Sequence, residues 1–231
     1  MNSYLELRFI SKNYFNQKKV NILKNINFRF KKGKIYSLVG PSGSGKSTLL
    51  NILSLIDRPS TGNLLFNSKK INFDDIDTND KLRSENFGII YQEKNLLSDF
   101  TAEENIILAG IANGKTIKDS KKLTEKILKQ LKLGLRSAHF PSELSGGENQ
   151  RIAIGRALIN SPNIIIADEP SGNLDHKNAK EFFKILFKLK SKNRIIIYAT
   201  HNRYFANLAD CRLQLIDGKL KTINARKNSR F

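Results

Sequence analysis

The chain has 231 residues, 39% of them hydrophobic, and a formal net charge of +19. This length and apolar content suffice for one sizeable core, so we expect a single domain over residues 1–231 that carries an inserted part. No apolar run approaches the roughly 18 residues of a membrane span, and the first twenty residues predict no secretory signal. The single cysteine, Cys211, excludes an internal disulfide.

The positive charge comes from 28 Lys and 12 Arg residues that are scattered along the whole chain. Proteins that bind nucleic acids tend instead to concentrate Arg in clusters. Two other interpretations are a diffuse, lysine-rich surface without a partner and attraction to an anionic membrane surface. We favour the diffuse surface and expect no nucleic-acid partner.

The first strand patterns lie in the N-terminal part of the chain. Residues 25–30 (NINFRF) alternate apolar Ile26, Phe28 and Phe30 with polar residues, which predicts a half-buried strand. Residues 34–40 (KIYSLVG) run apolar into glycine, which predicts a strand buried on both faces. Further short strands are expected at 87–91, 163–168 and 194–200, with helical patterns such as 178–190 between strands. This alternation indicates an α/β fold with a parallel sheet.

The strand pattern disappears beyond Gln92. Thr101 and Glu104 have the spacing of a capping box at a helix start, and residues 121–133 have helical periodicity. We therefore expect an inserted helical subdomain over residues 93–162.

The C-terminal part predicts one more strand pair. Residues 213–221 (LQLIDGKLK) have the pattern of a hairpin that turns at Asp217 and Gly218. Residues 225–231 are expected to form a frayed tail.

A phosphate-binding loop is predicted at residues 40–48, which read GPSGSGKST between a buried strand and a helix. Gly43 and Gly45 allow backbone N–H groups to curl around phosphates. Lys46 can reach the β and γ oxygens, and the Ser47 hydroxyl can ligate Mg²⁺. The residues expected to bind the nucleotide here are Gly40, Pro41, Ser42, Gly43, Ser44, Gly45, Lys46, Ser47 and Thr48. The alternative is a chance glycine-rich turn, and the motif alone indicates only a nucleoside triphosphate.

Two carboxylates end the apolar stretch IIIADEP, residues 164–170. Charges at the carboxyl end of a strand face the crevice where ligands bind in open α/β sheets. Asp168 is therefore a candidate to hold Mg²⁺ through water. Glu169 points to the opposite side of the strand's end, so it can address an attacking water. The alternative is a solvated acidic turn.

Gln92 and His201 follow two other predicted strands in the same way. If the sheet is parallel, both side chains lie at the edge where the phosphate loop lies. The neutral amide of Gln92 can touch Mg²⁺ or water, and the imidazole of His201 can approach the γ-phosphate. A surface glutamine and a structural histidine are the alternatives.

A second glycine pair occurs in ELSGGENQR, residues 143–151, directly before a helical pattern. Glycines at a helix start indicate that an anion approaches the backbone closely, because the N–H groups and the helix dipole favour negative charge. The chain already has a phosphate loop, so this segment indicates a second anion site.

In this order, the phosphate loop, Gln92, LSGGE, ADEP, SGNLD and His201 resemble the ATP-binding subunit of an ABC transporter over nearly the whole chain. The resemblance implies a P-loop NTPase fold with a mostly parallel sheet, an antiparallel β-subdomain and an inserted helical subdomain. It implies hydrolysis of ATP with Mg²⁺, with Glu169, His201 and Gln92 as catalytic residues. Ser47, Gln92 and Asp168 are then the candidate metal ligands.

The resemblance also implies that two copies pair head to tail around ATP. Ser145, Gly146 and Gly147 of one copy would contact the γ-phosphate that the other copy holds. Asp175 resembles the residue that lines the dimer seam. Tyr14 resembles the aromatic residue that stacks on adenine, and edge-strand packing of Tyr14 and its neighbour Phe15 is the alternative.

Two residues depart from common expectations. Glu148 stands where many family members have Gln, which adds an anion near a helix start. Gly155 falls inside the predicted helix 149–158 and should cost about 1 kcal/mol relative to Ala, unless close packing requires it.

Four stretches are similar to the ATPases of bacterial lipoprotein-releasing systems: 51–64, 98–106, 141–158 and 167–175. Macrolide-export and cell-division ATPases are close relatives with overlapping motifs. The resemblance implies two integral membrane subunits as partners and a peripheral location at the cytoplasmic face of the inner membrane. Leu96, Leu97 and Phe100 are candidates for an apolar docking groove, and burial of all three within the insert is the alternative.

Two rival functions remain open. A soluble ATPase of the same family could act on nucleic acid or the ribosome. Such proteins usually carry a long coiled coil or two fused ATPase units, and neither fits in this chain. A simple kinase would explain the phosphate loop but not LSGGE.

Overall fold

The computed structural model describes residues 5–16, 18–92 and 95–223. The chain divides into two compact units, one made of Met1–Arg83 with Lys190–Phe231 and the other of Ser84–Leu189. The tail predicted at 225–231 and the first two residues of the predicted insert lie outside the described residues. Each unit contains both strands and helices.

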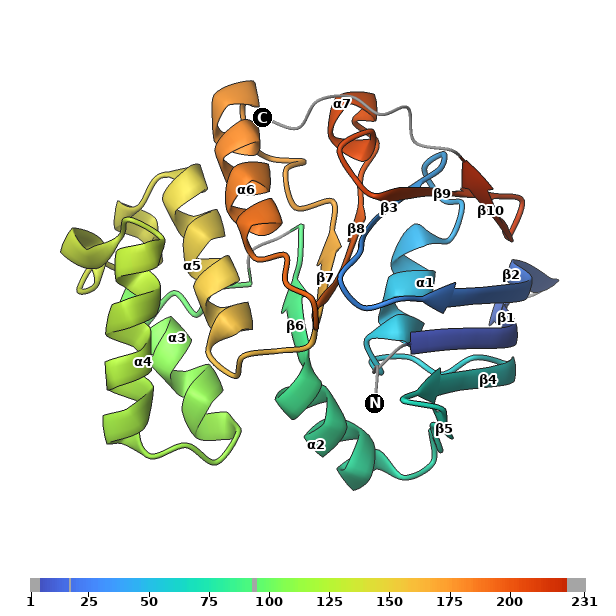
Figure 1. Ribbon diagram of the computed structural model, residues 1–231, viewed down its shortest axis with the longest axis horizontal. Coiled ribbons are helices and arrows are strands. Elements are labelled where there is room, and N and C mark those ends of the chain that lie inside the picture. Colours follow the sequence, from blue (N-terminus) through green and yellow to red (C-terminus); the bar gives the residue numbers. More distant parts are fainter. Residues whose placement is uncertain (1–4, 17, 93–94, 224–231) are drawn as a thin grey trace. The chain divides into compact units, whose positions relative to one another are not determined.

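An antiparallel sheet in the order β2-β1-β4-β5 forms one part of the first unit (Figure 1). Its strands are β1 (Leu5–Asn16), β2 (Lys18–Phe30), β4 (Thr61–Phe66) and β5 (Lys69–Lys70). In β2, Ile26 and Phe30 are buried and Phe28 is half-buried, so the half-buried strand is confirmed.

The same unit contains four strands in the order β10-β9-β3-β8. They are β3 (Ile35–Val39), β8 (Ile195–Ala199), β9 (Cys211–Ile216) and β10 (Lys219–Ile223). β3 runs parallel to both β8 and β9, and β3 and β8 are buried almost throughout. Asp217 and Gly218 have φ of 49° and 76°, which a tight two-residue turn requires, so the predicted hairpin of β9 and β10 is confirmed.

The helices of the first unit are short. They are α1 (Lys46–Leu53), which follows the phosphate loop, and α7 (Arg203–Ala206), which follows β8; α2 (Ile76–Asn86) continues into the second unit. α1 buries Leu49, Leu50, Ile52 and Leu53, so the helix that begins at the loop is fixed by apolar packing.

The second unit contains a pair of parallel strands, β6 (Phe87–Ile90) and β7 (Ile164–Asp168). Within the described residues between them, every element is helical. These elements are α3 (Ala102–Ala112), α4 (Ile117–Gln130), η1 (Gly134–Arg136), η2 (Pro141–Glu143) and α5 (Gly146–Leu158), and α6 (His176–Lys188) follows β7. The capping box predicted for Thr101 and Glu104 is confirmed at the start of α3.

Close packing explains the glycine inside α5. Helices α3, α4 and α5 lie side by side (Figure 1). A Cβ built on Gly155 would lie 2.6 Å from Cδ1 of Ile106 on α3 and 3.2 Å from Cγ2 of Ile127 on α4. The intrinsic cost of glycine in a helix is therefore offset by the close approach of the three helices.

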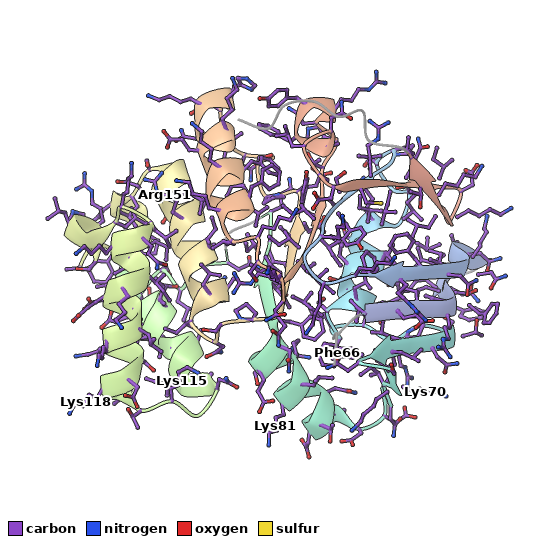
Figure 2. All side chains as sticks on the ribbon, viewed as in Figure 1. Phe66, Lys70, Lys81, Lys115, Lys118 and Arg151 are labelled. Atoms are coloured by element: carbon purple, nitrogen blue, oxygen red, sulfur yellow. The ribbon has the colours of Figure 1, made fainter. Side chains whose placement is uncertain are left out.

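Basic side chains are exposed on many separate elements. Lys70, Lys81 and Lys118 are exposed and belong to β5, α2 and α4 (Figure 2). In the part of the chain that the structure describes, no helix combines the length and apolar character that crossing a membrane requires.

Candidate functional site

The phosphate loop connects β3 to α1 in a conformation that glycine favours. Gly43 and Gly45 have φ of 74° and 98°, which are left-handed values. Among the described residues other than its chain neighbours, no atom lies within 4 Å of a Cβ built on Gly43, whereas one on Gly45 would lie 2.7 Å from Cγ2 of Ile22. Backbone conformation therefore explains Gly43, and conformation with packing explains Gly45.

The donors at this loop suit a polyphosphate. Lys46 Nζ donates to the carbonyl oxygens of Gly40 and Pro41, each at 3.1 Å, so the ammonium lies against the start of the loop. Ser44 Oγ is buried without a hydrogen-bond partner in the described part of the chain. α1 begins without a side-chain cap and without an acidic residue in its first turn. A helix N-terminus of this kind, next to a lysine, favours an anion.

His201 lies at the same edge of the first unit as the phosphate loop. β3 and β8 are parallel, and Leu38 lies opposite Ala199. Gly40 and His201 each follow that pair by two residues, and His201 is exposed. The register therefore places His201 beside the start of the loop, just after the end of a neighbouring strand.

Tyr14 is held by a charged pair on the same unit. Its hydroxyl donates to Asp57 Oδ2 at 2.9 Å, and Lys12 Nζ donates to Asp57 Oδ1 at 2.7 Å. The Lys12 ammonium also lies 4.9 Å from the centre of the Tyr14 ring. Partial burial, and next the hydrogen bond to Asp57, raise the pKa of the Tyr14 phenol. Tyr14 remains 44% exposed and Phe15 81% exposed, so neither residue is a core side chain.

Gln92 and Glu169 lie close together in the second unit. The register of β6 and β7 places Ile90 opposite Ala167, and each of the two residues comes two positions later. A Cβ built on Gly172 would lie 3.1 Å from Gln92 Nε2 and 3.3 Å from the carbonyl oxygen of Glu169. Glu169 has φ of 41°, a conformation that costs about 1 kcal/mol or more for a residue with a side chain. The chain thus turns sharply directly after Asp168.

The predicted metal ligands form an incomplete donor set. Within the described residues, no group of three or more His, Cys, Asp and Glu side chains could hold a metal ion. Ser47, Gln92 and Asp168 include one carboxylate, which ends β7. Mg²⁺ is commonly held by one or two carboxylates together with substrate phosphates and water. Ser47 belongs to the first unit, and Gln92 and Asp168 belong to the second. As residue types, a hydroxyl, an amide and a carboxylate are ligands that Mg²⁺ bound to nucleotide phosphates accepts.

The segment LSGGE, residues 144–148, is called the signature segment below. Ser145 is the N-cap of α5 and forms a capping box with Glu148. Ser145 Oγ accepts from the Glu148 N–H at 3.3 Å, and Glu148 Oε2 accepts from the Ser145 N–H at 2.8 Å. Glu148 Oε1 also accepts from Arg136 Nε at 3.2 Å. Hydrogen bonds from the Ser145 side chain and backbone, with the nearby Arg136 charge, lower the pKa of Glu148.

The second glycine of the signature segment has a packing reason. A Cβ built on Gly147 would lie 2.6 Å from Asn178 Oδ1 on α6. Asn178 Nδ2 in turn donates to Asp175 Oδ2 at 2.6 Å, and Asp175 caps α6. Hydrogen bonds from the backbone and side chain of Asn178 lower the pKa of Asp175. The Asn178 side chain therefore packs against the first turn of α5 and donates to Asp175.

Sequence reasoning did not find Arg136, Asn178 or the Lys12–Asp57 pair. Arg136 and Glu148 are twelve residues apart in the sequence, and Lys12 and Asp57 are 45 residues apart. No local pattern reports such contacts, because they depend on how elements pack. Asn178 carries a weak local signal, since it stands three residues after an N-cap aspartate.

Residues 96, 97 and 100 do not share one environment. Leu97 is 47% exposed and Phe100 is 38% exposed, while Leu96 is half-buried. The interpretation that all three are buried within the insert is therefore wrong. Asn105 accepts from the Leu97 N–H at 2.8 Å and donates to the Phe100 carbonyl at 3.0 Å, which fixes this turn ahead of α3.

Comparison with known proteins defines the class. The family model described as ABC transporter matches residues 23–172. The fold is similar to that of the ATP-binding cassette MJ0796, solved as a dimer in a post-hydrolysis state bound to ADP and Pi. That comparison has a TM-score of 0.88 and 34% sequence identity, and it covers 97% of this chain and 100% of the other. The chain belongs to the ABC transporter family, and the predicted ABC-type ATPase fold is confirmed.

Within the family, two kinds of relative match over most of this chain. The lipoprotein-releasing system ATP-binding protein LolD of Wigglesworthia glossinidia brevipalpis is 43% identical over 94% of this chain and 95% of its own length. LolD of Cytophaga hutchinsonii is 42% identical over 86% of this chain and 91% of its own length. The macrolide export ATP-binding/permease protein MacB of Bartonella quintana is 40% identical over 90% of this chain but 32% of its own length.

Proposed function

We propose that this chain is the ATP-hydrolysing subunit of a bacterial ABC transport complex that releases lipoproteins from the inner membrane. The observation that carries this proposal is the similarity to LolD proteins over almost the full length of both chains. The match to MacB at 40% identity makes macrolide export the second candidate. Both functions use the same ATPase chemistry.

In the proposed reaction, the phosphate loop binds the phosphates of ATP through its N–H groups and Lys46. Mg²⁺, held by Ser47, Gln92 and Asp168, would neutralise the charge that develops on the transferred phosphoryl group. Glu169 orients or deprotonates the attacking water, and His201 polarises the γ-phosphate. The positions of Gln92 and Glu169 beside Gly172, and of His201 in register with the loop, support these roles.

Tyr14 is proposed to stack on the adenine ring. Tyr14 is 44% exposed as a residue, and the hydrogen bond to Asp57 fixes the orientation of its side chain. The Lys12 ammonium lies near the ring and adds a cation–π contact. A fixed, exposed aromatic face in the unit that carries the phosphate loop suits a base.

We also propose that ATP is bound between two copies of the chain in a head-to-tail dimer. Ser145, Gly146 and Gly147 of one copy bind the γ-phosphate held by the phosphate loop of the other, and Asp175 lies at the seam. The Ser145 hydroxyl accepts from the Glu148 N–H at the start of α5, and on closure it would turn its one proton from the Glu148 carboxylate to the phosphate. The dimeric MJ0796 cassette with ADP and Pi supports this arrangement at 34% identity.

Mixed dimers test the sharing of the site. Lys46→Ala damages the phosphate loop and Ser145→Arg damages the signature segment, so each variant alone should be inactive. A mixed dimer retains one intact composite site, and mixing should therefore restore measurable ATPase activity. The control mixes Ser145→Arg with the double variant Lys46→Ala/Ser145→Arg. This mixed dimer contains no intact composite site. Full activity of Ser145→Arg alone would contradict a shared site.

Membrane partners are the other part of the proposal. We propose that the ATPase is peripheral at the cytoplasmic face of the inner membrane, bound to two integral subunits through the exposed turn that contains Leu97 and Phe100. Affinity purification from membranes at high salt should recover two integral proteins.

Reconstitution tests the transported substance. The two integral subunits, reconstituted in vesicles with this chain, should release a lipoprotein when ATP is added, and the Glu169→Gln variant should not support release. Recovery of nucleic acid in place of membrane subunits would overturn the proposal, and export of a macrolide alone would favour the second candidate.

A further inference from the structure

Glu148 places a negative charge where the proposed dimer brings a phosphate. It is the third residue of α5, and its side chain folds back onto the Ser145 N–H at 2.8 Å. The side chain is 19% exposed, so water screens its charge only in part. A carboxylate and a γ-phosphate at one helix N-terminus repel each other because both are negative, and they compete for the same N–H groups and dipole.

Arg136 is the cation that faces this carboxylate. Its Nε donates to Glu148 Oε1 at 3.2 Å, and its Nη1 lies 3.1 Å from His139 Nε2. Arg136 ends η1, and the turn after it is tied to α3. The carbonyls of Ser137 and His139 accept from N–H groups in the first turn of α3, at 3.0 and 2.8 Å. The backbone that presents Arg136 is thus anchored to a neighbouring helix.

We propose that Arg136 is a positioning residue for ATP hydrolysis: it neutralises Glu148 and holds it against the Ser145 backbone, so that the signature segment can receive the terminal phosphate of ATP. This inference rests on the proposed function, because it assumes that the signature segment binds a phosphate. Arg136 acts through Glu148 and does not itself touch the nucleotide.

A double variant separates this role from direct phosphate binding by Arg136. If the arginine acts only by offsetting Glu148, its removal matters only while residue 148 is charged. If it bound the phosphate itself, its removal would matter whatever residue stands at 148. The two cases therefore differ in the double variant Arg136→Met/Glu148→Gln.

The test is steady-state ATPase kinetics of the full chain. Arg136→Met should raise KM for ATP about three- to tenfold, because one uncompensated charge then repels the phosphate across a partly solvated distance. kcat should change less than about twofold. Arg136→Lys keeps the charge and should retain most of the wild-type affinity. Arg136→Met/Glu148→Gln should have the same KM as Glu148→Gln.

Arg8→Met is the matched control. Arg8 also pairs with a glutamate, at 2.8 Å from Glu6, and its side chain is 49% exposed, as is that of Arg136. Its removal should leave KM for ATP unchanged. A general loss of surface charge would instead affect both arginine variants alike.

Two results would overturn the inference. One is a wild-type KM for Arg136→Met, and the other is a raised KM that Glu148→Gln does not correct. Should Arg136→Met fail to fold, the comparison of Glu148→Gln with the double variant still decides, since any difference in KM contradicts a role through Glu148. The proposed sharing of the site is judged separately, by whether Ser145→Arg alone is fully active.

Discussion

The phosphate loop and the signature segment both carry glycines at the start of a helix, but the glycines have different causes; contrary to the sequence pattern, the signature glycines are the first two residues of α5 itself. In the phosphate loop, Gly43 has φ of 74° with open space around it, so its cause is backbone conformation. In the signature segment, Gly147 lies within a helix, and a Cβ there would meet Asn178 at 2.6 Å. The same sequence signal therefore arises once from the backbone and once from packing.

The two helix starts also differ in charge. α1 has neither a side-chain cap nor an acidic residue in its first turn, so its N–H groups are left to a ligand. α5 is capped by Ser145 and carries Glu148, so it already holds an anion of its own. This difference suits a loop that grips its own nucleotide and a segment that closes onto one held elsewhere.

The largest expected effects come from Lys46→Ala and Ser145→Arg, which separate ATP binding by the phosphate loop from closure of the dimer. Lys46→Ala should lose both ATP binding and turnover, because a main cation for the phosphates is removed. Ser145→Arg should lose turnover by about 100-fold or more, yet its subunit should bind ATP as the wild type does. Equilibrium binding of a fluorescent ATP analogue and a turnover assay make the distinction. Lys70→Ala, which changes an exposed lysine on β5, is the control. Loss of ATP binding in the Ser145→Arg monomer would remove the distinction between the two regions.

Glu169→Gln should affect neither region directly, since Glu169 belongs to the turn after β7. The amide keeps the size of the side chain but removes its ability to accept a proton, so turnover should fall about 100-fold or more while ATP binding persists. Size-exclusion chromatography with light scattering should find this variant dimeric with ATP and monomeric without it. Turnover like that of the wild type would exclude Glu169 from the reaction, and a strictly monomeric ATP-bound form would argue against the composite site.

Glycine replacements test the two causes directly. Gly147→Ala should lower the free energy of unfolding by about 1–2 kcal/mol, because Asn178 must move and its bond to Asp175 is disturbed. Asn178→Ala should restore part of this loss in the double variant. Gly43→Ala should cost about 1 kcal/mol through φ alone, with no second site to restore it. Denaturant unfolding of the single and double variants gives the coupling energy.

Gly134→Ala is the matched control for these replacements. Gly134 has open space around it and no positive φ, so alanine there should change stability little. A coupling energy of zero between positions 147 and 178 would contradict the packing explanation. The glycine at position 147 would then be explained by phosphate binding alone.

Local patterns predicted the parts of the fold that depend on short stretches of chain. Alternation in β2, the turn at Asp217 and Gly218 and the capping box at Thr101 each follow from a few neighbouring residues. The sequence could not predict contacts between elements, such as the approach of Asn178 to Gly147. It also could not separate the two reasons for glycine, because both place glycines at the start of a helix. For the candidate site, motif order supplied the residues, and packing supplied the side chains that hold them.

The smallest expected effect is on the stability of the fold at acidic pH. The folded-state pKa of Glu148 lies below its ordinary value of 4.5, first because of its hydrogen bond with the Ser145 side chain. The carboxylate therefore stabilises the fold fully above pH 4.5, and this contribution is lost as pH falls through the lower folded-state pKa. Glu148→Gln should remove that pH dependence at a cost near neutral pH of about 0.5–1 kcal/mol, typical of a helix cap. Thermal unfolding between pH 7 and about pH 3 measures it. α1 has no acidic residue in its first turn, so the start of α1 should add no comparable pH dependence to the stability of the fold. An unchanged acid profile in Glu148→Gln would mean that the capping box contributes little to the stability of the signature segment.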